Sequence, residues 1–309
     1  MRADFRDLVE KAKSHGIYVA VAASVTPKLN QGTIDDIKRL GVDIISVSLD
    51  GATPNTHDKL RGVPGTWNAT IEALKAARSS GLRAQINTTV MKSNLDELAD
   101  IFRIVNETGA VAWEVFFLIR TGRGASLENV RPFESEEVMH FLFDASQYGV
   151  PVRTAEGPHF RRIRVQRQRG ESPPEGELYN QLAARLREIE GQPNARPLAK
   201  YTPTRDGKGL MFVGHDGQVH PSGFLPINTG RLPKDRLISI YRTNQLFIDL
   251  RDASKLKGRC GKCEYRSICG GSRSRAFAEL ADPLEEDPAC AYVPAADQAL
   301  ALSETIEMS

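Results

Sequence analysis

The first half of the chain repeats one pattern, in which a helical spacing of apolar residues ends at a glycine and an apolar run follows within a few residues. The glycines are Gly16, Gly41, Gly81, Gly109 and Gly149. A glycine readily ends a helix, and the β-rich run behind it predicts a strand. The predicted strands are 17–22, 42–49, 83–90, 111–119 and 150–154. Repeated helix–strand units predict an α/β fold with a parallel sheet.

Two of these strands are more polar than buried strands normally are. Alternation places three polar residues of each strand on one face, namely Ser46, Ser48 and Asp50 in one strand and Gln85, Asn87 and Thr89 in the other. A strand buried on both faces would be nearly all Val, Ile and Leu. Because parallel sheets bind ligands at the carboxyl ends of their strands, this pattern predicts a site for a polar ligand. A water-filled or self-satisfied interior remains the alternative.

Length and charge limit the classes of function. A chain of 309 residues that is 40% hydrophobic predicts a globular protein of about two domains. The 41 basic and 39 acidic residues give a net charge of +2, which argues against nucleic acid or an anionic membrane as the main partner. The first residues, Met1 to Leu8, are too charged for a signal peptide, and no apolar run reaches membrane-spanning length. A cytoplasmic location is therefore expected.

All four cysteines lie in one stretch, with the spacing Cys260-x2-Cys263-x5-Cys269-x20-Cys290. Four thiolates can enclose one zinc ion or hold one iron–sulfur cluster. Grouped cysteines in a long chain without a secretory leader favour a metal over disulfides. Spacing alone leaves zinc and cluster open, although the usual zinc ribbon repeats its Cys-x-x-Cys pair and this chain does not.

The residues around the cysteines carry a resemblance to a known family. The run from Cys260 reads CGKCEYRSICGGSRSRA, and the run that ends at Cys290 reads DPLEEDPAC. Both resemble the SPASM or twitch domain, the C-terminal auxiliary-cluster region of radical S-adenosylmethionine (SAM) enzymes, and most of all its haem-biosynthesis-like members. The resemblance implies one auxiliary 4Fe–4S cluster with four ligands: Cys260, Cys263, Cys269 and Cys290. Full members carry a further cysteine where this chain has Arg273, so a second auxiliary cluster is not implied.

Two glycines and two arginines follow the third cysteine. Gly270 and Gly271 are expected to let the backbone pass close to a bulky cluster, where a side chain would clash. Arg273 and Arg275 are expected to offset the negative charge of the thiolates. Ordinary surface salt bridging is the alternative for each arginine.

A second resemblance lies in the first half of the chain. Residues 47–51 (VSLDG) and 57–62 (HDKLRG) resemble the fourth strand and the following loop of the radical SAM barrel. The resemblance implies four contacts with SAM: Ser48, Arg61 facing the carboxylate, Asn87 near the ribose or amino-acid part, and Leu118 against the adenine. An arginine suits a carboxylate because its planar fork can donate two hydrogen bonds. His57 and Asp58 are expected to organise the loop.

Radical SAM chemistry also needs a cluster held by three cysteines, which the family supplies as Cys-x3-Cys-x2-Cys after the first strand. No cysteine precedes Cys260. The resemblance therefore implies a partial radical SAM (β/α)6-type barrel that lacks its first two strands, and an N-terminally truncated chain that is inactive alone. Strand 17–22 would be an exposed apolar edge, and we expect a complementing N-terminal chain to cover it. No catalytic residue is assigned.

The sequence predicts three segments: a partial barrel over 1–155, a helical and loop connector over 156–205, and an auxiliary cluster domain with a C-terminal helix over 206–309. The basic run 159–169 holds five arginines, which indicates a solvated face or a loop against an acidic surface. An anionic substrate such as a tetrapyrrole carboxylate is the alternative. Residues 210–220 predict a β-hairpin with a tight Asp-Gly turn.

The family chemistry is reductive cleavage of SAM to a 5′-deoxyadenosyl radical, which abstracts a hydrogen from a peptide or tetrapyrrole substrate. The resemblance implies an electron donor such as ferredoxin or flavodoxin. By resemblance the chain is an enzyme, although its catalytic cluster motif is absent. A non-catalytic iron–sulfur electron-transfer or partner subunit, and a structural zinc-binding protein, are the alternatives.

Overall fold

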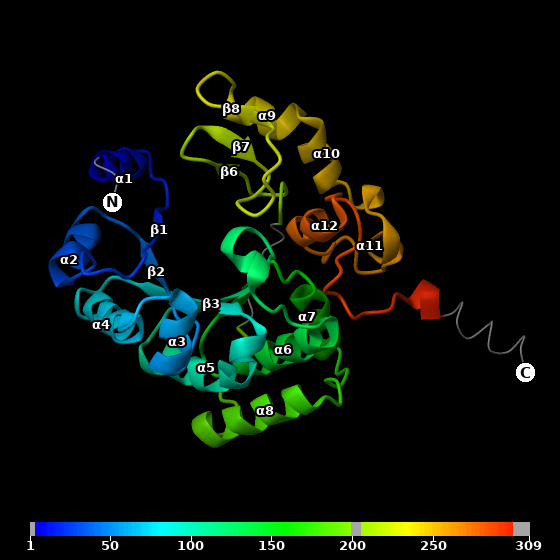
Figure 1. Cartoon of the computed structure of the whole chain (residues 1–309), viewed down its shortest axis with the longest axis horizontal. Helices are drawn as coiled ribbons and strands as arrows, with labels where there is room; N and C mark the ends of the chain where they lie inside the picture. Colours follow the sequence, from blue (N-terminus) through cyan, green and yellow to red (C-terminus); the bar gives the residue numbers. More distant parts are fainter. Residues whose placement is uncertain (1–3, 199–204, 299–309) are drawn as a thin grey trace, which may run out of the picture. The chain divides into compact units, whose positions relative to one another are not determined.

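The structure is a computed structural model that describes residues 4–198 and 205–298 (Figure 1). The chain folds into two compact units, each assembled from three stretches. Within the described residues, the first unit comprises 4–116, 141–153 and 175–198, and the second comprises 117–140, 154–174 and 205–298. In neither unit does a described helix combine the length and the apolar character that crossing a membrane requires.

The first unit is built on a five-stranded sheet with the order β1-β2-β3-β4-β5. Its strands are β1 (Ala20–Ala22), β2 (Ile44–Ser48), β3 (Ala84–Val90), β4 (Ala112–Phe117) and β5 (Val152–Ala155). β1 pairs in parallel with β2, and β2 pairs in parallel with β3. The predicted α/β fold with a parallel sheet is confirmed, and each of the five predicted strands is present with slightly different bounds.

Helices connect the strands. They are α1 (Phe5–Ser14), α2 (Gln31–Arg39), α3 (Pro54–Arg61), α4 (Thr66–Ser79), the 3₁₀ helix η1 (Lys92–Glu97), α5 (Leu98–Glu107), the 3₁₀ helix η2 (Gly122–Ser126), α6 (Pro132–Ala145) and α8 (Glu177–Glu190). In the first unit α2 packs beside α4, and α8 lies along α5 (Figure 1). The helical spacing predicted over 178–189 is confirmed by α8.

The stretch after β2 was expected to be a loop, but residues 54–61 form helix α3. The side chain of Thr53 accepts a hydrogen bond from the backbone N–H of Thr56, and Pro54 occupies the first turn. Gly62 ends the helix in the left-handed conformation, with φ 71°. A threonine cap, an early proline and a final glycine are ordinary helix boundaries, so the local sequence accounts for this helix.

The core of the first unit lies around Trp113, which is fully buried. Its indole Nε1 donates a hydrogen bond to Thr88 Oγ1 at 2.9 Å, and Thr88 Oγ1 donates to the backbone oxygen of Leu49 at 2.7 Å. The ring of Phe102 packs on Trp113 with 5.6 Å between centroids. Burial alternates along β3, which leaves Gln85, Asn87 and Thr89 half-buried on the other face, as their spacing predicts.

The second unit contains a small antiparallel sheet, β6-β7-β8. Its strands are β6 (Phe212–Val213), β7 (Gln218–His220) and β8 (Gly230–Arg231). The predicted hairpin is confirmed, and Gly217 at its turn has φ 82°. Val219, Ile240 and Phe247 form the core beneath this sheet.

The other helices of the second unit carry the cysteine region. They are α7 (Phe160–Gln168), α9 (Leu237–Thr243), α10 (Gln245–Arg251), the 3₁₀ helix η3 (Ala253–Lys255), α11 (Gly258–Lys262) and α12 (Arg273–Leu280). Residues 295–298 are helical, and the rest of the predicted C-terminal helix lies outside the described residues.

Candidate functional site

The four cysteines line one cavity in the second unit. Cys260 lies in α11, Cys263 caps the end of that helix, Cys269 precedes the two glycines, and Cys290 lies in the C-terminal segment. All four are free thiols. His159 and the α7 residue Arg162 line the same cavity, so the connector contributes to the site together with the cysteine region.

Each of the four sulfur atoms accepts a hydrogen bond from the backbone. The N–H of Asp287 donates to Cys260 Sγ at 3.4 Å. The other three cysteines accept from the residue two positions further along the chain: Cys263 from Tyr265, Cys269 from Gly271, and Cys290 from Tyr292. Backbone donors stabilise a thiolate, which is the form that binds a metal.

Burial acts against ionisation of these thiols. It raises the pKa of all four, and for Cys269 and Cys290 the pKa rises to about 12. Thiols that stay protonated at neutral pH are poor nucleophiles. These cysteines would ionise when a metal supplies positive charge to the cavity.

The cysteines do not converge on a single ion. Within residues 4–198 and 205–298, no group of three or more His, Cys, Asp or Glu side chains is arranged to hold one metal ion. The four thiols nevertheless share one cavity. This cavity is the candidate site for a metal group.

The two glycines after Cys269 have φ of 70° and 64°. A Cβ atom on Gly270 would lie 1.8 Å from Nη1 of Arg205. A Cβ atom on Gly271 would lie 2.4 Å from Nη2 of Arg273 and 2.9 Å from Cys260 Sγ. Side chains are therefore excluded at both positions, and two arginines as well as Cys260 fill the space that the glycines leave.

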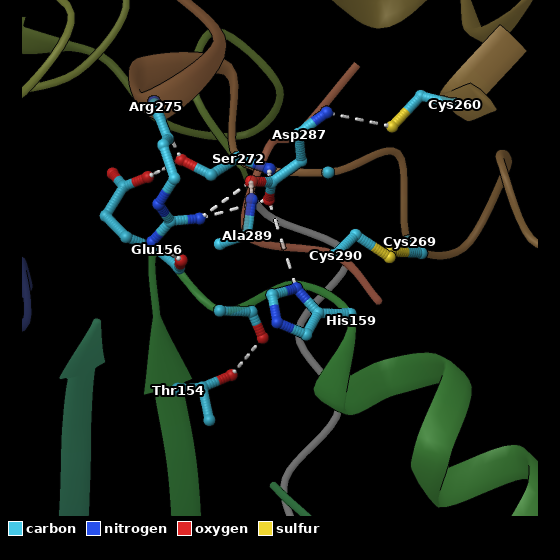
Figure 2. Close-up of polar contacts among 12 residues, drawn as sticks. Thr154, Glu156, His159, Cys260, Cys269, Ser272, Arg275, Asp287, Ala289 and Cys290 are labelled. Carbon is cyan, nitrogen blue, oxygen red and sulfur yellow. Dashed lines mark hydrogen bonds and ion pairs between the residues drawn. The ribbon is translucent and has the colours of Figure 1, made fainter. Parts of the chain in front are cut away.

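Arg275 and Asp287 form a buried ion pair next to the cavity (Figure 2). Nη1 of Arg275 lies 2.9 Å from Oδ1 of Asp287, and the backbone N–H of Ser272 donates to Oδ2 at 2.7 Å. Burial alone would raise the pKa of Asp287, but the Arg275 charge, the neighbouring His159 and the hydrogen bonds from Ser272 and Arg275 together outweigh it, and the pKa falls to about 2. Arg273 and Arg275 are both buried, which excludes the alternative of ordinary surface salt bridging.

Glu156 was not singled out by the sequence, yet its carboxylate is part of this polar network (Figure 2). It accepts hydrogen bonds from the hydroxyls of Ser272 at 2.5 Å and Ser274 at 3.2 Å. Burial, together with the nearby carboxylate of Asp206, raises the pKa of Glu156 to about 8. Its φ of 55° is rare for a residue other than glycine and marks a constrained position.

His159 is fully buried and lies beside Asp287 (Figure 2). Its Nδ1 is 3.9 Å from Oδ2 of Asp287, and neither ring nitrogen has a hydrogen-bond partner among the described residues. Burial lowers the pKa of His159 to about 4, so the ring is neutral at pH 7. Sequence patterns alone indicate no role for His159 beyond its place in the basic run.

The basic run 159–169 is not a uniformly solvated face. Arg162 is buried, pairs with Glu136 at 2.6 Å and lies over the ring of Tyr292 at 4.4 Å. Arg162 belongs to the wall of the cysteine cavity. An acidic partner for this run therefore exists within the second unit itself.

In the first unit, two predicted SAM contacts are neighbours across strands, because Ser48 of β2 is paired in register with Asn87 of β3. The polar face is partly self-satisfied, since Gln85 Nε2 donates to Asn87 Oδ1 at 2.8 Å and to Glu114 Oε2 at 3.0 Å. Burial raises the pKa of Glu114.

The third predicted contact, Arg61, forms an ion pair with the buried carboxylate of Asp50. Oδ1 of Asp50 also accepts the backbone N–H of Thr89 at 2.8 Å, and the backbone N–H of Asp50 donates to His57 Nδ1 at 3.0 Å. Burial raises the pKa of Asp50 although Arg61 opposes the shift. Burial and the Arg61 charge lower the pKa of His57 to about 4.

The remaining predicted residues are Asp58 and Leu118. Asp58 accepts backbone N–H bonds from Gly65 at 2.6 Å and Trp67 at 2.7 Å, so it organises the turn between α3 and α4. Leu118 belongs to the second unit and is buried. Its contact with an adenine stays a prediction.

Known proteins resemble this chain over nearly its whole length. The sequence profile of the Radical SAM superfamily matches residues 1–105. An AdoMet-dependent heme synthase of Methanosarcina barkeri is 33% identical over 294 residues, which cover 95% of this chain and 80% of that protein. A pre-heme d1 synthase of Dinoroseobacter shibae is 24% identical over 302 residues, which cover 96% of this chain and 72% of that protein.

A solved structure shares the fold. The structure of native anSMEcpe with bound AdoMet and the Cp18Cys peptide has a TM-score of 0.62 and 16% sequence identity. The match covers 93% of this chain and 76% of that chain. At this identity the likeness concerns the fold alone.

Proposed function

Because this chain belongs to the radical SAM superfamily, we propose that its second unit holds one 4Fe–4S cluster on Cys260, Cys263, Cys269 and Cys290. The shared cavity and the four backbone donors support this assignment. The residues around the cysteines resemble an auxiliary-cluster domain, which favours a cluster over a structural zinc ion. A zinc ion held by the same four thiolates is the alternative that the experiment below tests.

The chain's own residues would prepare the cavity for such a cluster. The backbone N–H groups of Tyr265, Gly271, Tyr292 and Asp287 would stabilise the ligating thiolates. Gly271 leaves room for Cys260 Sγ. When bound, the cluster would supply electron transfer or substrate binding.

We propose that the chain serves the family chemistry, in which SAM is cleaved reductively and the resulting 5′-deoxyadenosyl radical abstracts a substrate hydrogen. The similarity to heme synthases favours a tetrapyrrole over a peptide as the substrate. Ser48, Asn87 and Arg61 would contact SAM from the polar ends of the strands. Arg61 is about one third exposed, so its guanidinium remains within reach of a carboxylate while Asp50 holds it in place.

The 309-residue chain contains no cysteines beyond the four in the second unit. We therefore propose that these 309 residues do not cleave SAM by themselves, and that further protein covers β1 when SAM is cleaved. β1 supports this, because it is the edge strand of the sheet, and the adjoining Ile17 and Tyr18 are 55% and 57% exposed. Formation of 5′-deoxyadenosine by the reconstituted chain alone would contradict this part of the proposal.

The cluster assignment is tested by anaerobic reconstitution with iron and sulfide, followed by metal analysis and visible absorption spectroscopy. We expect a brown protein with about four irons per chain. Separate Cys→Ser variants of all four positions should lose most of the iron and the colour. Ser267→Ala, an exposed residue in the same loop, is the matched control and should keep both. A colourless wild-type protein with one zinc would instead identify a structural zinc site.

A further inference from the structure

Four buried arginines lie near the cysteines: Arg162, Arg205, Arg273 and Arg275. Arg162 lines the cavity, Arg205 and Arg273 contact atoms of Cys269 and Cys260, and Arg275 contacts Asp287 of the cavity wall. Two of them have carboxylate partners, since Arg162 pairs with Glu136 at 2.6 Å and Arg275 pairs with Asp287 at 2.9 Å. Among residues 4–198 and 205–298, neither Arg205 nor Arg273 has a carboxylate within ion-pair distance. Within the described residues, these two buried guanidinium groups therefore have nearby carboxylates, such as Asp206 for Arg205 and Asp282 for Arg273, but no direct ion pair.

Arg205 is held by backbone carbonyl groups. Its Nη1 donates to the backbone oxygens of Cys269 at 3.2 Å and Arg266 at 3.5 Å, and its Nη2 donates to that of Leu250 at 3.5 Å. The buried Nε has no hydrogen-bond partner within the described part of the chain. These bonds place the guanidinium against the backbone of residues 263–271, the loop that carries Cys263, Cys269 and the two glycines. We call this segment the ligand loop.

Arg273 is held in the same way on the other side of the loop. Its Nη1 donates to the backbone oxygens of Pro283 at 3.0 Å and Glu285 at 2.5 Å, and its Nε donates to that of Gly271 at 3.2 Å. Its Nη2 points toward Cys260 Sγ at 3.7 Å. The second guanidinium is thus in direct contact with a cysteine sulfur.

The two glycines of the ligand loop leave room for the guanidinium groups of Arg205 and Arg273. Gly270 and Gly271 have positive φ, and a Cβ atom at either position would collide with the terminal nitrogen of Arg205 or Arg273, respectively. The positive φ favours glycine at both positions, and a larger residue would also displace the terminal nitrogens of the two arginines.

A buried charge without a partner is strongly unfavourable. Four thiolates around a 4Fe–4S core carry about two net negative charges, and a reduced core leaves about three. Such a group would match the two arginines that lack a direct ion pair with a described carboxylate.

We propose that Arg205 and Arg273 are the counter-charges of the four-cysteine site, and that they favour the reduced, more negative state of the group bound there. This inference rests on the proposed cluster assignment. Reduction adds one electron, supplied in the experiment by dithionite, and it breaks or forms no bond in the protein. Positive charges at hydrogen-bond distance from the ligand loop stabilise the added negative charge.

The test compares Arg205→Gln and Arg273→Gln with Arg205→Lys and Arg273→Lys in the reconstituted full chain. Iron and sulfide contents are measured first, and the reduction potential is then measured by a dithionite titration followed by electron paramagnetic resonance. At a fixed potential, each glutamine variant should show about a tenfold lower ratio of reduced to oxidised cluster. This change corresponds to a reduction potential that is lower by about 59 mV for one electron. Each lysine variant should show a smaller shift, because it keeps the charge.

Arg251→Gln is the matched control, since Arg251 also donates to a backbone oxygen, but to that of Tyr241 and not to an atom of a cysteine. Its potential should equal that of the wild type. Glutamine variants that lose iron while the lysine variants retain it would also support a counter-charge role. Two results would overturn the inference and leave the cluster assignment standing. One is an unchanged reduction potential in glutamine variants that hold a full cluster, and the other is an equal loss of iron from the glutamine and lysine variants. A wild-type protein that holds only zinc would overturn both.

Discussion

Nη1 of Arg275 lies 2.9 Å from Oδ1 and 3.1 Å from Oδ2 of Asp287, and both side chains are buried. The same aspartate donates its backbone N–H to Cys260 Sγ. The ion pair therefore joins helix α12 to the C-terminal segment at a point that also touches a cysteine. It is a structural support of the candidate site.

We predict that Asp287→Ala lowers the free energy of unfolding by about 3–5 kcal/mol, because it leaves the buried Arg275 charge without a partner. The measurement is urea unfolding followed by circular dichroism. Asp282→Ala is the control, since Asp282 pairs with Lys257 at the exposed surface, where a loss of about 0–1 kcal/mol is expected. Equal losses from the two variants would contradict the role given to the buried pair.

The carboxyl group of Glu156 makes the stability of the second unit depend on pH. Its pKa is about 8 in the folded protein, against an ordinary value of 4.5, because it is buried and faces Asp206. The contribution of protonated Glu156 to the unfolding free energy is complete below about pH 4.5 and is lost as the pH rises through about 8. The reason is that the unfolded chain releases this proton at a lower pH than the folded protein does. Glu156→Gln should flatten the fall in unfolding free energy over this range, whereas Glu279→Gln, at an exposed position of α12, should not. A fall of the same size in both variants would refute the assignment.

The Asp50–Arg61 pair gives a prediction for the first unit. Arg61→Ala removes the cation that opposes the raised pKa of Asp50, so that pKa should rise further. The variant should lose roughly 1–3 kcal/mol of unfolding free energy at neutral pH. The loss should shrink toward acid pH, where Asp50 is protonated in both states. The double variant Asp50→Asn/Arg61→Ala should be less destabilised than Arg61→Ala at pH 7, and a strictly additive result would count against the pair.

Trp113 gives a prediction for the core of the first unit. Trp113→Ala should lower the unfolding free energy by about 3–5 kcal/mol, because it removes a fully buried ring that packs on Phe102 and leaves Thr88 without a donor. Trp67 is half-buried near the start of α4, so Trp67→Ala should cost clearly less. Chemical denaturation followed by circular dichroism ranks the two, and the reverse ranking would contradict this view of the core.

The sequence predicted what depends on local periodicity. Alternation along β3 identified the half-buried residues Gln85 and Asn87, because side chains of a strand change face at every residue. The signals for α3 are also local, with Thr53 at its start and Gly62 at its end, whereas the family resemblance predicts a loop there. The helix boundary residues are the better guide, because they act directly on the local backbone.

Contacts between distant parts of the sequence were not predictable. Glu156 and Ser272 are 116 positions apart, and no local pattern indicates that their side chains meet. Arg162 belongs to a run that predicted a solvated face, yet Glu136 neutralises its charge and permits its burial. Burial of charged side chains depends on partners that only the folded chain supplies.

Three of the cysteines accept hydrogen bonds from residues only two positions further on, whereas two of the surrounding arginines, Arg162 and Arg205, come from well outside the ligand segment. A synthetic peptide of residues 258–292 would thus retain the local hydrogen-bond donors for these sulfurs but would lack the positive charges of Arg162 and Arg205. Transplanting the ligand loop into another scaffold would then carry over the coordination chemistry without the electrostatic environment that the whole second unit provides.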